Sequence, residues 1–215
     1  MISCVGFVNS RFSSNSYIIA HQDYTNVWLI DPGDVQPILA WMRGHEKCSV
    51  SGIMLTHTHF DHIYGINELL EQFPDSRIYV ANELGKEALY DAKKNASRYT
   101  EYGPIVIKDT ADVRIPEPLV TLWPDVVMQV MWTPGHSEDS LCFVVDNMMF
   151  TGDTLINNVR TVTKLRGGSE EKLKRSMAQI SQFVKRGFVI FPGHGEVFSL
   201  DDCDLNNSCR QPYAD

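Results

Sequence analysis

The sequence has 215 residues, of which 43% are hydrophobic and 21% charged, the balance of an ordinary globular protein. This length suits one domain of the larger kind, so we expect a single domain over residues 1–215. The net charge of −8 disfavours a nucleic-acid partner, because an acidic surface repels phosphates.

The first half of the chain predicts strands followed by helices. Three strands are expected over residues 4–8, 16–20 and 27–30, and the last ends at the turn Asp31-Pro32-Gly33. Asp34 is suited to cap a helix that ends near Gly44. Further strands are expected over residues 51–55 and 77–80, and further helices over residues 63–73 and 83–95.

The second half repeats this pattern. Residues 99–118 are polar and irregular, which indicates a loop or an insertion over a site. Ser169 is suited to cap a helix that Gly187 ends. Strands are expected over residues 119–123, 126–132, 139–145, 148–150 and 188–191. Two rounds of strands and helices predict an α/β fold with two sheets packed face to face and helices outside.

Several features of the sequence bear on the expected cellular location. No apolar run is long enough to span a bilayer, so we expect no membrane contact. Residues 1–16 lack a basic stretch followed by an apolar one, so we expect no signal peptide. Five cysteines with scattered spacing favour free thiols in the cytoplasm, with Cys203 and Cys209 unpaired. The oligomeric state is not indicated.

A run of histidines follows the strand expected at residues 51–55. His57, His59 and His62 lie within six residues, with Asp61 between them. Alternation along an extended segment sends His57 and His59 to the same side. Four donor groups are too many for one ion that also keeps an open position, so this run indicates two metals.

Other parts of the chain supply donors in the same setting. His136, Asp153 and His194 each follow an apolar strand directly after a glycine, which lets the backbone bend. A carboxylate has two oxygens, so Asp153 is suited to bridge two ions. The six remaining groups give each ion three terminal ligands. His21 and His45 are interpreted as surface residues.

Four motifs in this order resemble those of the metallo-β-lactamase superfamily. They are Thr-His-Thr-His-Phe-Asp-His, Pro-Gly-His136-Ser, Phe-Thr-Gly-Asp153-Thr and Pro-Gly-His194-Gly. Their spelling is nearest to the glyoxalase II-like (hydroxyacylglutathione hydrolase-like) branch, and the resemblance covers residues 17–196. It implies an αββα four-layer sandwich with two mixed β-sheets. It also implies His57, His59 and His136 at one ion, Asp61, His62 and His194 at the other, and Asp153 between them.

Two divalent ions, most simply zinc with iron or manganese as alternatives, suit a hydrolase. A water shared by two cations loses its proton near neutral pH, and the resulting hydroxide attacks an acyl carbonyl. Asp61 is expected to orient this nucleophile or to shuttle a proton. A thiolate leaves readily because thiol pKa values lie near 8.5, so a small thioester or ester substrate is favoured over an amide.

Substrate recognition is expected to differ from that of glyoxalase II. The Gly-Cys-Gly-Lys/Arg-Phe-type stretch and the later tyrosine of that family are replaced here, and about twenty residues follow His194 instead of a helical region. Glutathione thioesters are therefore expected to be poor substrates. Arg160, Lys164 and Arg166 are candidates for contacting an anionic group, against the alternative of a solvated loop. Trp123, Trp132 and Tyr64 are candidates for lining the pocket, although core packing is favoured for both tryptophans.

The same ligands allow other functions. A mononuclear iron persulfide dioxygenase and a lactonase of this superfamily share the motif set, and the bound metal would distinguish the first of them. A true β-lactamase is disfavoured by Asp153, and a nuclease by the acidic charge. A non-catalytic binding module would be marked by a lost ligand, and none is lost.

Overall fold

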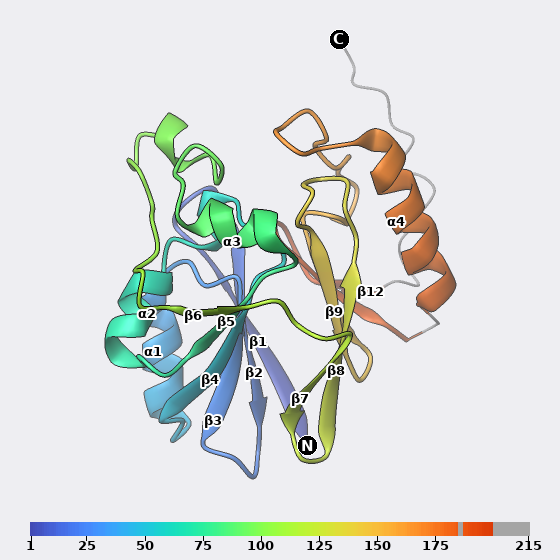
Figure 1. Ribbon diagram of the computed structural model, residues 1–215. Helices are drawn as coiled ribbons and strands as arrows, with labels where there is room; N and C mark the ends of the chain where they lie inside the picture. Colours follow the sequence, from blue (N-terminus) through green and yellow to red (C-terminus); the bar gives the residue numbers. More distant parts are fainter. Residues whose placement is uncertain (185–186, 200–215) are drawn as a thin grey trace. The chain divides into compact units, whose positions relative to one another are not determined.

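The computed structural model describes residues 1–184 and 187–199. The chain divides into two compact units, Met1–Pro116 and Glu117–Asp215. Each unit contains one six-stranded sheet (Figure 1). The expected single domain over residues 1–215 stays a prediction, and Cys203 and Cys209 lie outside the described residues.

The sheet of the first unit has the strand order β1-β2-β3-β4-β5-β6. The first three strands pair antiparallel, and β3 to β6 pair parallel, so the sheet is mixed. Every residue of β2 is buried, as expected for a central strand rich in isoleucine. The strands are β1 (Ile2–Val8), β2 (Asn15–His21), β3 (Asn26–Ile30), β4 (Ser49–Met54), β5 (Arg77–Tyr79) and β6 (Asp112–Arg114).

Two helices cover one face of this sheet, α1 (Val35–Gly44) and α2 (Ile66–Gln72) (Figure 1). Both are amphipathic, and Ile38 of α1 and Leu69 of α2 join a core with Leu29 and Ile53 of the sheet. The unit also contains η1 (Phe60–His62), α3 (Glu83–Leu89) and η2 (Ser97–Tyr99). The side chain of Asn82 caps α3 by accepting a hydrogen bond from the amide of Gly85.

The sheet of the second unit has the order β12-β11-β10-β9-β8-β7 and is mixed because β10 and β11 pair parallel. Helix α4 (Glu170–Phe183) lies along it and packs Leu173, Met177 and Ile180 into a core with Met149 and Ile190 (Figure 1). The strands are β7 (Leu119–Trp123), β8 (Val126–Trp132), β9 (Leu141–Val145), β10 (Met148–Gly152), β11 (Val189–Pro192) and β12 (Phe198–Ser199).

Most predicted elements are confirmed, including the cap of α4, where Ser169 accepts from the amide of Lys172. The prediction that residues 99–118 are irregular is wrong at β6, an edge strand too short and polar to give a periodic signal. The helix expected to residue 95 ends at Leu89, and α4 ends at Phe183, before Gly187. Asp34 makes no capping bond, because its carboxylate accepts from Ser10 and Tyr64 instead.

In residues 1–184 and 187–199, no helix has both the length and the apolar composition needed to cross a membrane.

Candidate metal centre

The predicted ligand run of the first unit follows β4 directly. His57 is 1% exposed and His62 is fully buried, and Asp61 and His62 lie in the short helix η1. His59 precedes η1 and is partly exposed. The local backbone therefore changes from strand to helical turn within six residues, which presents four donor groups from one rigid segment.

Asp31, which the sequence indicated only as part of a turn, is hydrogen-bonded to the predicted ligand run. Its buried carboxylate accepts from the amide and the hydroxyl of Thr56, and its Oδ2 lies 3.0 Å from Nδ1 of His62. Burial raises the pKa of Asp31, and the hydrogen bonds from His62 and Thr56 act against that rise. The signal available in the sequence was an acidic residue directly after a buried strand, beside the strand that leads into the histidine run.

These bonds decide which nitrogen of each histidine is a metal donor. The hydroxyl of Thr56 donates to the carboxylate of Asp31, so its oxygen accepts from Nδ1 of His57 at 3.1 Å. The carboxylate of Asp31 similarly accepts from Nδ1 of His62. A neutral imidazole with a proton on Nδ1 carries its lone pair on Nε2. Both histidines are therefore set to offer Nε2, as metal-ligating histidines held by a second group do.

Two predicted ligands of the second unit meet at one turn. Asp153 follows β10 in a turn closed by the amide of Thr154 and the carbonyl of Thr151, 3.0 Å apart. The amide of Gly193 donates to the carbonyl of Gly152 at 2.8 Å, which ties the residue before His194 to the residue before Asp153. Strand pairing between β10 and β11 thus brings together two residues that are 41 positions apart in the sequence.

His136, the third donor of this unit, is positioned by a glycine. Gly135 has φ of +154°, and a Cβ added there would lie 2.5 Å from the Cα of Leu173 in α4. This close approach lets the carbonyl of Gly135 accept from the amide of Ser169 at 2.8 Å. Nδ1 of His136 donates to the carbonyl of Val162 at 2.9 Å, so Nε2 is again the donor atom for a metal.

The spacing of the donor atoms fits metal coordination. Nε2 of His136 and Nε2 of His194 each lie 3.6 Å from the same atom, Oδ2 of Asp153. In the first unit, Nε2 of His62 also lies 3.6 Å from Oδ2 of Asp61. This is longer than an ordinary hydrogen bond. Two ligands bound tetrahedrally at about 2.1 Å from one ion are separated by about 3.4 Å. The residues present therefore fit a metal, and one oxygen of Asp153 lies equally close to two histidine nitrogens.

The three predicted substrate contacts lie in different environments. Arg160 forms an ion pair with Glu170 in the first turn of α4, whereas Lys164 and Arg166 are exposed. Trp123 is buried, as predicted. The core prediction for Trp132 is wrong, because its ring is 53% exposed and its indole N–H donates to the carbonyl of Glu138.

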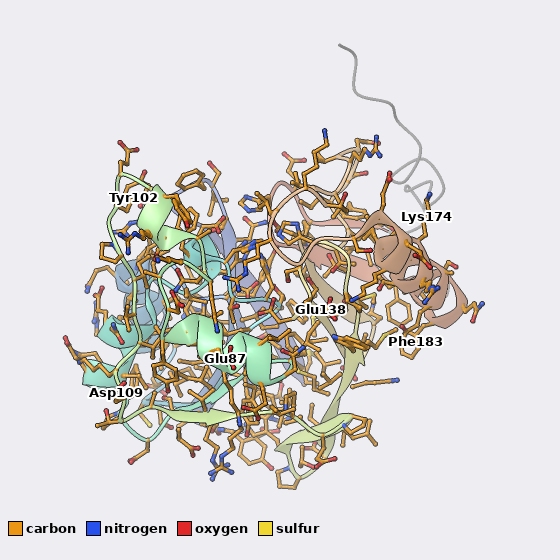
Figure 2. The ribbon with its side chains drawn as sticks, turned by 45° about the horizontal axis from the view of Figure 1, so that its top comes forward. Glu87, Tyr102, Asp109, Glu138, Lys174 and Phe183 are labelled. Atoms are coloured by element: carbon orange, nitrogen blue, oxygen red, sulfur yellow. The ribbon has the colours of Figure 1, made fainter. Side chains whose placement is uncertain are left out.

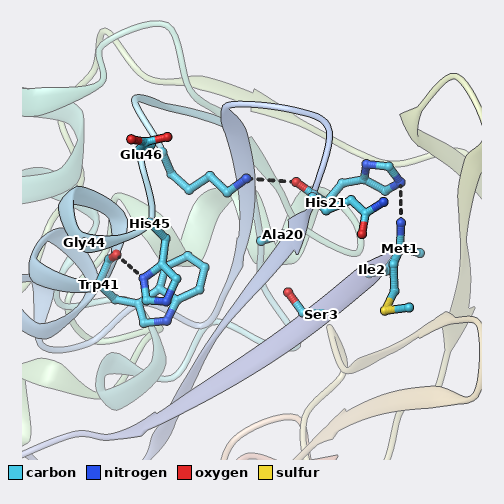
Figure 3. A pocket seen from close by; sticks show the side chains of 11 residues that line it. Met1, Ile2, Ser3, Ala20, His21, Trp41, Gly44, His45 and Glu46 are labelled. Carbon is cyan, nitrogen blue, oxygen red and sulfur yellow. Dashed lines mark hydrogen bonds between the residues drawn. The ribbon is translucent and has the colours of Figure 1, made fainter.

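The two remaining histidines line a different pocket, an open cavity of about 420 Å³ in the first unit (Figure 3). None of the seven predicted ligands lines it. His45 is exposed, as predicted, and stacks on Trp41 with ring centroids 4.1 Å apart. The surface prediction for His21 is wrong, because β2 is buried along its whole length and His21 is only 4% exposed.

Comparisons with known proteins show the family of this chain. Residues 9–194 match the family model of the metallo-beta-lactamase superfamily. A hydroxyacylglutathione hydrolase from Pseudoalteromonas translucida is 26% identical over 171 residues, 79% of this chain and 57% of that protein. The structure of BLEG-1 B3 metallo-beta-lactamase matches with a TM-score of 0.83 and 23% identity over 95% of both chains. TTHA1623 in a di-iron-bound form matches with a TM-score of 0.77 and 23% identity over 96% of this chain and 97% of that one.

The chain therefore belongs to the metallo-β-lactamase superfamily, and the predicted α/β fold class with two mixed sheets and flanking helices is confirmed. The predicted likeness to the glyoxalase II branch is confirmed by several hydroxyacylglutathione hydrolases at modest identity. The chain spans about half the length of those relatives.

Proposed function

We propose that this protein is a dinuclear-metal hydrolase of small thioester or ester substrates. One ion would be held by His57, His59 and His136 and the other by Asp61, His62 and His194, and Asp153 would be a ligand of both. Zinc is the simplest choice of metal, with iron or manganese as alternatives. The observation that carries the proposal is the single oxygen of Asp153 at 3.6 Å from the Nε2 atoms of two histidines.

When bound, a pair of divalent cations supplies an acidified water and polarises a carbonyl oxygen. The chain's own contribution is to hold the donors rigid. Asp31 and Thr56 orient His57 and His62, and the carbonyl of Val162 orients His136. Such outer contacts normally fix the tautomer and the ring orientation of a ligating histidine.

Asp61 is the proposed proton carrier. Asp61 is 8% exposed, and its backbone carbonyl accepts from the hydroxyl of Ser14 at 2.7 Å. A carboxylate at this position would take up a proton released during the reaction. The donor set contains no separate acid, so a leaving group that departs without protonation, such as a thiolate, is favoured.

The proposed substrate is a small molecule with an anionic group, and Lys164 and Arg166 are its proposed contacts. Arg160 would have to exchange its pairing with Glu170 to take part. The net charge of −8 argues against a nucleic-acid substrate. The free thiols of Cys4, Cys48 and Cys142 support a cytoplasmic location.

Glutathione thioesters are proposed to be poor substrates. Two segments differ from the glyoxalase II pattern. After Asp153 the sequence is Leu155-Ile156-Asn157-Asn158-Val159-Arg160, and after His194 it is Gly195-Glu196-Val197. Lost charge-assisted contacts at about 1.5–3 kcal/mol each lower kcat/KM by well over a hundredfold when several are missing. A kcat/KM near 10⁶ M⁻¹s⁻¹ for S-lactoylglutathione would contradict this proposal.

The test of function is an activity panel on metal-loaded protein, with a thioester, an ester, a lactone and a persulfide as substrates. Hydrolysis of the thioester or ester supports the proposal. Oxygen consumption with the persulfide and one iron per chain would replace it with a dioxygenase. Preference for the lactone would assign a lactonase. The Asp61→Asn variant should lose activity while keeping its thermal melt, because the carboxylate acts as a proton carrier in addition to its binding role.

A further inference from the structure

Three polar side chains of the first unit lie inside the protein. Polar side chains usually lie at the surface, as that of Asp109 does (Figure 2). Asn9, in contrast, is only 2% exposed, and Ser14 and Ser16 are fully buried. We call these three residues the Asn9 network. A buried polar group is costly unless it is hydrogen-bonded, so the role of the network follows from its partners.

The backbone fixes the orientation of the Asn9 side chain. The backbone amide of Asp34 donates to Oδ1 of Asn9 at 2.9 Å. A backbone N–H can only donate, so the side-chain oxygen must face it and the NH2 group must point the other way. Nδ2 of Asn9 donates to the hydroxyl oxygens of Ser14 at 3.0 Å and Ser16 at 2.9 Å. A Cβ added to Gly33 would lie 2.4 Å from Cγ of Asn9, so the glycine leaves room for this amide.

The two bonds from Asn9 decide where the serine hydroxyl protons go. Each serine oxygen accepts from Asn9, so its own proton is directed to another acceptor. The hydroxyl of Ser14 donates to the backbone carbonyl of Asp61 at 2.7 Å. The hydroxyl of Ser16 donates to the backbone carbonyl of Asp31, also at 2.7 Å, and its contact with Oδ1 of Asn9 is longer, 3.1 Å. One side-chain amide therefore directs hydrogen bonds to the backbone of two acids of the candidate metal centre.

The bond from Ser14 supports the helical turn η1. This turn has only three residues, and one of its own hydrogen bonds runs from the amide of His62 to the carbonyl of His59 at 3.0 Å. The last carbonyls of a short helix have no partner within it and need one from outside. The hydroxyl of Ser14 is such a partner for the carbonyl of Asp61. The network therefore holds the backbone from which Asp61 extends its carboxylate.

We propose that Asn9 is a positioning residue for the reaction, because its amide directs the two hydroxyls that hold the backbone of Asp61 and Asp31. This inference rests on the proposed function, in which Asp61 is a metal ligand and a proton carrier. The amide is required as a donor. In Asn9→Asp an oxygen replaces the NH2 group, and both serine hydroxyls would donate to it, because hydrogen bonds to a carboxylate are the stronger ones. The two backbone carbonyls would then lose their donors.

The first measurement needs neither metal nor turnover. Amide hydrogen exchange is followed by NMR on metal-free protein at pH 7, where carboxyl groups are ordinarily ionised. The amide of His62 should exchange at least about tenfold faster in Asn9→Asp and in Ser14→Ala than in wild type, because η1 opens more often when a buried carbonyl lacks its donor. The amide of Ile53, in the middle of the same sheet, should keep its rate and thus show that the change is local.

Ser76→Ala is the matched control. Ser76 is a buried serine of the same unit, and its hydroxyl donates to the carbonyl of Val50 at 2.9 Å. The variant therefore removes the same kind of hydrogen bond away from the ligand run. It should leave the exchange rate of His62 within about twofold of wild type. The second measurement is zinc affinity by competition with a chromophoric chelator, which should fall about tenfold in Asn9→Asp and stay within about twofold in Ser76→Ala.

An unchanged exchange rate of His62 in Asn9→Asp would overturn the proposal. Equal acceleration at His62 and Ile53 would also overturn it, because the network would then support the fold in general. Faster exchange at His62 with wild-type zinc affinity would do the same, since the ligands would bind equally well without the network. Circular dichroism checks folding, and Asn9→Ala, which also removes the donor, replaces Asn9→Asp if that variant does not fold.

Failure of the proposed function has a different signature. Absence of thioester and ester hydrolysis by wild-type protein would refute that function alone, because the exchange rates are measured without metal and without turnover.

Discussion

The two units present metal donors in different ways. In the first unit, four donors lie within six residues of one strand-to-helix segment, His57 to His62. In the second, His136, Asp153 and His194 are spread over 59 positions and are brought together by the sheet and by α4. The first set depends on local backbone and on one buried acid, Asp31. The second depends on strand pairing and on a glycine that admits close packing.

This difference predicts different responses to mutation. Damage to the first set should change the orientation of the ligands while leaving the fold intact, because the segment is anchored by hydrogen bonds. Damage to the contacts of the second set should lower the stability of the fold more readily, because the contacts that place these ligands also join the sheet to the helix. The three predictions below test this contrast.

The largest effect is expected at Asp153. In Asp153→Asn the side chain keeps its shape but loses the charge that offsets two cations, so kcat should fall by about a thousandfold with a loss in melting temperature of only a few degrees. Steady-state rates and a thermal melt measure the two quantities. Asp146→Asn, a change at an exposed turn of the same sheet, is the control. Full activity of Asp153→Asn at full metal loading would show that Asp153 is not shared.

The next effect is expected at Asp31. In Asp31→Asn an NH2 group replaces one of the two accepting oxygens, so the three hydrogen bonds from Thr56 and His62 cannot all be kept and the orientation of two ligand rings is loosened. Loss of an outer contact of this kind weakens metal affinity by about 10–100-fold. Competition with a chromophoric chelator measures the affinity. Asp34→Asn removes a carboxylate that bonds to Ser10 and Tyr64 instead, and it should leave metal affinity within about twofold. Equal affinity in wild type and Asp31→Asn would show that Asp31 plays no positioning role.

The smallest effect is expected at Gly135, where a substitution should lower the stability of the fold. The Cβ of Gly135→Ala would overlap the backbone of Leu173, which should cost about 1–3 kcal/mol and lower the melting temperature by roughly 5 °C. Gly187→Ala is the matched control. Gly187 also has positive φ, but a Cβ added there would meet no atom within 4 Å. Gly187→Ala therefore measures the cost of backbone strain without the cost of overlap. A smaller loss at Gly135 than at Gly187 would contradict the packing role of Gly135.

The sequence could predict most strands of the two sheets and could nominate seven candidate donors because each signal is local. A strand that ends in glycine and histidine is visible without a structure, and so is a run such as His57 to His62. Asp31 was hidden because its role depends on Thr56 and His62, which lie 25 and 31 positions away. The burial of Trp132 and of His21 was predicted wrongly, because burial depends on which elements cover a strand.

The central proposal is that the seven candidate donors hold two metal ions. Native mass spectrometry of protein loaded with a zinc excess and then desalted counts the ions on each folded chain. The account predicts two ions on wild-type protein and one or none on Asp153→Asn. A single ion on wild-type protein under conditions that saturate binding, with His62→Ala and His194→Ala still holding that ion, would contradict it.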